Sequence, residues 1–103
     1  MTMTLQVLYP IGDGKTFDYE YYVETHLPMV DEVLKPHGLM SASFSRGLAG
    51  GPNKPPGYFA IATMAFADEQ SMNAALVAAG PLLGDMPNFT NVAPEMLIGS
   101  QLG

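Results

Sequence analysis

The chain has 103 residues and a mass of 11.0 kDa, and its 10 acidic residues against 4 basic ones give a formal net charge of −6. This length fits a single domain over residues 1–103 with one modest hydrophobic core. The negative charge disfavours nucleic acids and anionic membranes as partners, and the absence of cysteine excludes disulfides and thiolate metal sites.

The beginning of the chain is expected to form a strand followed by a helix. Residues 3–9 alternate along the strand, and one face carries apolar side chains that end with Tyr9. From Phe17 onward apolar residues recur at helical spacing, with Thr16 as the expected N-cap. Because Pro28 lacks a backbone N–H, we expect a kink or break just before it.

The rest of the chain is expected to form three strands and a second helix, for which Asp68 is the expected N-cap. The long hairpin connection is rich in Gly and Pro, and the strand after it is apolar on both faces, which is typical of a strand covered on both sides. In chain order the segments are a strand at 39–48, a hairpin connection at 47–57, a strand at 58–66, a helix from 69 to about 79, a loop at 84–91 and a strand at 92–100.

This order of elements predicts a ferredoxin-like α+β fold, in which two helices cover one face of a four-stranded antiparallel sheet. Two short helices cannot cover both faces of strands that contain so many large apolar residues. These residues include Phe44, Tyr58, Met64 and Phe66. A second copy of the same sheet is the simplest cover, so we expect a homodimer that pairs through its sheet faces.

An ordered set of residues carries a likeness to a known family. These residues are Tyr9-Pro10, Phe17-Asp18, Tyr21-Tyr22-x-x-x-His26-x-Pro28, Gly38-Leu39, Phe66 and Asp85-x-x-x-Phe89-Thr90. With them the chain resembles an EthD-type protein of the dimeric α+β barrel superfamily. The resemblance implies a ferredoxin-like protomer that pairs into a barrel, with a small apolar pocket between the first helix and the sheet.

The same resemblance implies a class of chemistry. EthD proteins are associated with ethyl tert-butyl ether degradation, and the superfamily includes isomerases, polyketide cyclases and cofactor-free monooxygenases. Those relatives act on small apolar carbonyl or phenolic compounds.

His26 and Tyr22 are the expected catalytic residues. They lie four residues apart and therefore share one helix face. An imidazole can remove a proton next to a carbonyl near neutral pH, and a tyrosine hydroxyl can donate a hydrogen bond to the carbonyl oxygen. Alternatively, His26 ties the helix break to the backbone and Tyr22 is a core aromatic; a haem-ligating role for His26 also stays open.

The pocket is expected to have a mainly apolar lining, although each apolar member could equally be part of the core. The expected lining residues are Phe17, Phe44, Phe59, Ile61, Met64 and Asp85. Asp85 either accepts backbone N–H groups in its loop or orients His26. Because the chain has no phosphate-binding fingerprint and its two histidines lack metal-ligand spacing, we expect neither a cofactor nor a metal.

The leading functional hypothesis is a cytoplasmic protein that binds a small apolar or aromatic compound. As an enzyme it would be a cofactor-independent isomerase, cyclase or monooxygenase that uses His26 for proton transfer. The chain shows no secretory pattern and no apolar run long enough for a membrane span. The alternatives are a non-catalytic binding or accessory protein with the same pocket, and an assembly module whose apolar face serves oligomerisation only.

Overall fold

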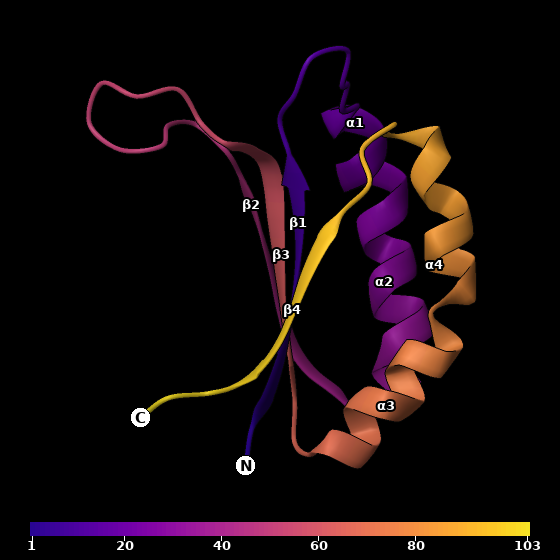
Figure 1. The fold of residues 1–103 in the computed structure, drawn as a ribbon. Coiled ribbons are helices and arrows are strands. Elements are labelled where there is room, and N and C mark those ends of the chain that lie inside the picture. The colour runs from indigo at the N-terminus through magenta and orange to yellow at the C-terminus, as the bar shows by residue number, and fades with distance from the viewer.

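The computed structural model describes residues 1–103 and contains one four-stranded antiparallel sheet with all helices on the same side of it (Figure 1). The strands are β1 (Met3–Pro10), β2 (Leu39–Arg46), β3 (Tyr58–Phe66) and β4 (Glu95–Ser100), in the order β2-β3-β1-β4. The helical segments are α1 (Tyr19–Tyr21), the π-helical turn η1 (Tyr22–His26), α2 (Leu27–Leu34), the 3-10 turn η2 (Lys35–His37), α3 (Glu69–Ala78), α4 (Gly80–Asp85) and the 3-10 turn η3 (Met86–Asn88). This arrangement confirms the predicted ferredoxin-like α+β fold. None of the helices has the length and hydrophobicity needed to span a bilayer.

The first helix continues through Pro28, where a kink or break was expected. The π-helical turn η1 precedes the proline, and the N–H of Leu27 donates to the carbonyl of Tyr22, five residues back. Pro28 then occupies the first turn of α2. The wider π-helical turn holds one extra residue and relieves the clash between the proline ring and the preceding turn. The helix therefore continues past Pro28 without a break.

The N-cap of this helix is Asp18, and the expectation of Thr16 was wrong. The carboxylate of Asp18 accepts a hydrogen bond from the N–H of Tyr21 at 3.1 Å. The backbone of Thr16 is already bonded elsewhere: its N–H donates to Asn91 Oδ1 and its carbonyl accepts from Thr90 Oγ1. These contacts tie the entry of the first helix to the segment that leads into β4.

The segment 84–91 is mainly helical, although a loop was expected there. Pro81 lies in the first turn of α4, where its missing N–H removes no helical hydrogen bond. The preceding helix α3 ends at Ala78, as expected, and Gly80 and Pro81 begin the further helix α4, which η3 extends to Asn88. As a result Asp85 lies on a helix that packs beside α2, and β4 begins at Glu95 and not at 92.

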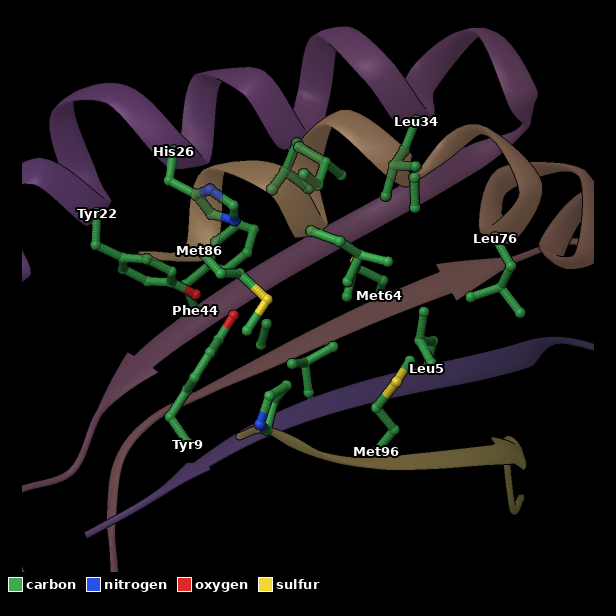
Figure 2. A pocket seen from close by; sticks show the side chains of 17 residues that line it. Leu5, Tyr9, Tyr22, His26, Leu34, Phe44, Met64, Leu76, Met86 and Met96 are labelled. Carbon is green, nitrogen blue, oxygen red and sulfur yellow. The ribbon is translucent and has the colours of Figure 1, made fainter. Parts of the chain in front are cut away.

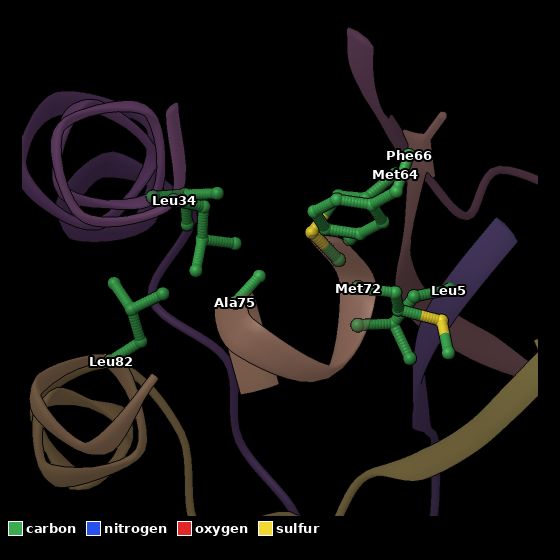
Figure 3. Close-up of a cluster of buried hydrophobic side chains, with 9 residues drawn as sticks. Leu5, Leu34, Met64, Phe66, Met72, Ala75 and Leu82 are labelled. Carbon is green, nitrogen blue, oxygen red and sulfur yellow. The ribbon is translucent and has the colours of Figure 1, made fainter. Parts of the chain in front are cut away.

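The main core lies between the sheet and the helices (Figure 3). Phe66 from β3 is completely buried there, with Leu5 from β1, Leu34 from α2, Ala75 from α3 and Leu82 from α4 around it. A second buried cluster lies toward the N-terminal end of the first helix. It consists of Tyr9, Tyr22, Ala60, Phe89 and Val92.

The open face of the sheet is less apolar than expected. Phe44, Met64 and Phe66 all face the helices, so β3 is covered by this chain on one face only. The open face carries threonines, serines and a glutamine in addition to several apolar side chains. Its residues are Thr4, Gln6, Leu8, Ser41, Ser43, Ser45, Ile61, Thr63, Ala65 and Leu97. Alternation places every second residue of a strand on this side.

Asp68 caps the second helix as predicted, and its removal should have a measurable cost. Its carboxylate accepts from the N–H of Ser71 at 2.8 Å, and this bond holds the pKa of Asp68 below its ordinary value. We expect Asp68→Ala to lower the free energy of unfolding by about 1 kcal/mol, because a helical N–H loses its partner. Urea unfolding measures this. Asp31→Ala is the matched control, because the 3.8 Å contact of Asp31 with Lys35 is exposed and contributes little; equal losses in both variants would contradict the cap assignment.

Candidate functional site

A cavity of about 290 Å³ lies between the sheet and the helices (Figure 2). Fifteen of its seventeen lining residues are hydrophobic, which together with this volume is typical of a site for a small organic molecule. Two lining residues, Leu83 on α4 and Met96 on β4, are more than half exposed. The cavity therefore reaches the surface between these two elements.

His26 lines this cavity and is held by Asp85 behind it. His26 Nδ1 lies 2.9 Å from Asp85 Oδ2, and both side chains are buried. The other carboxylate oxygen of Asp85 accepts from the hydroxyl of Tyr21 at 2.6 Å and from the amide of Asn88 at 3.0 Å. The ring of Phe89 lies 4.5 Å from the imidazole and limits its movement.

The hydrogen bonds to Asp85 determine which nitrogen of His26 faces the cavity as an acceptor. The bond from Tyr21, aided by that from Asn88, holds the pKa of Asp85 below its ordinary value, so the carboxyl is ionised at neutral pH. An ionised carboxylate only accepts hydrogen bonds, so the proton of a neutral His26 lies on Nδ1. Nε2, which has no partner in the chain, is then free to accept a proton.

Two tyrosine hydroxyls accompany Nε2 at the cavity. Tyr9 from β1 and Tyr22 from η1 are both buried and line the cavity, with ring centroids 6.0 Å apart. Figure 2 shows their hydroxyls pointing toward one another. Burial raises the pKa of Tyr9 to about 12 and raises that of Tyr22 as well. Both hydroxyls therefore stay neutral and can act as hydrogen-bond donors.

The structure brings together some of the residues predicted for the site and separates others. His26, Tyr22, Phe44 and Met64 line the cavity, and Asp85 lies directly behind His26. In these positions the Tyr22 and His26 rings stack at 5.5 Å. Of the two roles considered for Asp85, a loop-forming acceptor of backbone N–H groups or a partner that orients His26, the structure shows the contact with His26.

Phe17, Phe59 and Ile61 do not line the cavity. Phe17 packs edge-on against Tyr22 at 4.9 Å, behind the cavity wall, and stacks with Phe59 at 5.7 Å. Ile61 lies on the open face of the sheet, opposite Leu8. Met64 and Ile61 are an odd number of residues apart in β3, so they must point to opposite faces of the sheet.

Sequence reasoning missed Tyr9 and Tyr21 as members of the site. The alternation of β1 already placed Tyr9 on the same side as Leu5 and was a usable signal for it. No comparable signal existed for Tyr21, whose partner Asp85 lies 64 residues away in the chain. No group of three or more His, Asp or Glu side chains lies close enough together to hold a metal ion.

Comparison with solved structures finds proteins with a similar fold. An EthD-like protein from Ralstonia eutropha matches with a TM-score of 0.86 and 31% identity over 96% of this chain and 90% of its own. An EthD family protein from Bacillus halodurans matches with a TM-score of 0.70 and 20% identity over 99% of this chain and all of its own. SnoaB, a cofactor-independent oxygenase from Streptomyces nogalater, matches with a TM-score of 0.64 and 11% identity over 99% and 93% of the two chains. No family model matches the sequence, and a search of curated protein sequences gives no match.

Together the fold and the cavity define a ferredoxin-like α+β protein with an apolar cavity between its helices and its sheet. At 31% identity over nearly the whole of both chains, the likeness to the Ralstonia protein is specific. The chain belongs to the EthD-like family.

Proposed function

We propose that this protein binds a small apolar or aromatic carbonyl compound in the cavity beside His26 and catalyses proton transfer on it without a cofactor. The observation that carries the proposal is the Asp85–His26 pair: Asp85 holds Nδ1, and Nε2 faces an apolar cavity. An imidazole oriented in this way is a general base, and an apolar site strengthens its interaction with the reacting group.

The chemistry requires no group beyond these residues and the substrate. Nε2 removes a proton from a carbon next to the carbonyl, and the electron pair of that C–H bond moves toward the oxygen to form an enolate. The Tyr22 hydroxyl donates to that oxygen. The imidazolium then returns the proton to another carbon of the conjugated system, which gives an isomer. Alternatively, the imidazolium first exchanges its proton with solvent and delivers the solvent proton to the same carbon, which gives isotope exchange.

The comparisons support this class of reaction at a coarse level. The Streptomyces protein with the same fold is a cofactor-independent oxygenase, and an enolate is also the species that such a reaction would present to O₂. We therefore propose an isomerase, cyclase or oxygenase reaction. A role in ethyl tert-butyl ether degradation is a further proposal that rests on the family alone.

Hydrogen–deuterium exchange tests the proposal without knowledge of the natural substrate. The probe is 2-tetralone, an uncharged bicyclic ketone with acidic C–H groups next to the carbonyl, in heavy water at neutral pD. We expect saturable, protein-dependent loss of these proton signals by NMR. Binding of the ketone with no exchange above that of free imidazole at equal concentration would contradict catalysis and support the binding-protein alternative.

We also propose that the protein forms a homodimer through the open face and the edge of its sheet. Three consecutive apolar residues on the edge strand β4, Met96, Leu97 and Ile98, are each more than half exposed. The hairpin between β2 and β3 projects beyond the open face, away from the helices (Figure 1). An exposed apolar edge strand is a template for pairing with another chain. Sedimentation equilibrium at micromolar concentration should give twice the mass of one 11.0 kDa chain; a stable monomer would contradict the dimer.

A further inference from the structure

We propose that Tyr9 is a second ligand-binding hydroxyl, that Tyr9 and Tyr22 together hold one carbonyl oxygen, and that the ligand of this cavity is uncharged. The inference rests on the proposed function and narrows its substrate class. The ligand is a ketone or aryl carbonyl compound with an acidic hydrogen next to the carbonyl, and carboxylates are rejected.

The two hydroxyls are unusual among the tyrosines of this protein. The other three hydroxyls donate to acceptors in the chain: Tyr19 to the carbonyl of Phe59, Tyr21 to Asp85, and Tyr58 to Glu95. Tyr9 and Tyr22 have no such partner, although only 3% and 4% of their surfaces are exposed. No fully enclosed side-chain nitrogen or oxygen lacks a hydrogen bond, so these hydroxyls must open onto the cavity.

Because each hydroxyl opens onto the cavity and has no partner in the chain, a ligand acceptor there can take up its hydrogen bond. The hydroxyls of Tyr9 and Tyr22 point toward one another from β1 and η1 (Figure 2), so one oxygen placed between them can accept from both. Their raised pKa values keep them protonated. Two neutral donors at one oxygen stabilise the negative charge that develops there when a neighbouring proton leaves.

The charges around the cavity exclude an anionic ligand. None of the four basic residues of the chain lines it, and Arg46 stacks over the ring of Tyr19 at 3.9 Å instead. Asp85, which is negative, lies behind His26. A carboxylate would lose its hydration in an apolar cavity without gaining an opposite charge, which is strongly unfavourable.

Acetophenone and benzoate test this inference, because they have nearly the same shape and differ in charge. Both are titrated by calorimetry at about pH 8, where an ordinary imidazole is neutral. We expect acetophenone to bind on the order of 100-fold more tightly than benzoate, since the cost of an unpaired buried charge exceeds that factor. Tyr9→Phe and Tyr22→Phe should each weaken acetophenone binding about three- to tenfold, which corresponds to one hydrogen bond.

Tyr58→Phe is the matched control, because its hydroxyl bonds Glu95 away from the cavity; it should bind acetophenone as the wild type does. Circular dichroism checks that each variant is folded. Benzoate that binds as tightly as acetophenone, or a Tyr9→Phe variant with unchanged affinity, would overturn this inference and leave the proposed pocket intact. Failure of the folded wild type to bind either acetophenone or 2-tetralone would overturn the proposed function as well.

Discussion

Replacing His26 with alanine is expected to lower the rate of 2-tetralone exchange by a factor of about 10² to 10⁴, the range contributed by a positioned general base. The reason is geometric: His26 is the cavity residue whose free nitrogen can accept a proton, and Asp85 holds it in that tautomer. Ketone affinity should change far less than the rate, because most of the lining is apolar and stays in place.

The other histidine provides the matched control. His37 lies in the exposed 3-10 turn η2, outside the cavity, so His37→Ala should exchange protons at the wild-type rate. A His26→Ala variant that is folded and exchanges the ketone as fast as His37→Ala would contradict the catalytic assignment. If the wild-type protein catalyses no exchange and His26→Ala binds the ketone much more weakly, the result would instead support a binding role.

Replacing Asp85 with alanine is expected to lower the free energy of unfolding by about 3–5 kcal/mol, because each hydrogen bond to an ionised acceptor contributes about 1.5–3 kcal/mol. Three donors meet at this carboxylate: His26 Nδ1, the Tyr21 hydroxyl and the Asn88 amide. All three would lose their acceptor. Since a small domain is stable by only about 5–15 kcal/mol, the loss should be evident as a lower urea midpoint.

Asp85→Asn separates the structural role of this residue from its electrostatic role. The amide keeps one oxygen acceptor but adds two donors, so it should destabilise less than alanine while still disturbing the tautomer of His26. We therefore expect its exchange rate to fall even where the protein is folded. A fully active Asp85→Asn variant would contradict the positioning role of Asp85.

The same residue predicts how stability depends on pH. The pKa of Asp85 is lower in the folded protein than its ordinary value, mainly because Tyr21 donates to the carboxylate. The stability that it contributes is therefore fully present above the ordinary pKa of an aspartate, near 4, and is lost as the pH falls through the lowered folded value. The stability difference between the wild type and Asp85→Asn should shrink below about pH 4; a difference independent of pH would contradict the assignment.

Local sequence patterns predicted the order of the elements because each depends on near neighbours. Alternation along β1 and the cap at Asp68 needed only a few residues of context, and the structure confirms them. The shared helix face of Tyr22 and His26 depends in the same way on their spacing, and both residues lie at the cavity. An error arose at Pro81, which has two local roles: it follows the end of α3, as predicted, and it occupies the first turn of α4, which was not predicted.

The amino-acid pattern alone was sufficient to predict the ferredoxin-like topology, and it singled out His26 as the candidate for proton transfer. Only the folded chain brings Asp85 to His26 across 59 residues, adds Tyr21 to the same carboxylate, and leaves Tyr9 beside Tyr22 without a partner. It also places Ile61 on the open face and divides the large side chains of the strands between core and cavity. Periodicity reports which face a side chain occupies, whereas the distance between residues far apart in the chain depends on how whole elements pack.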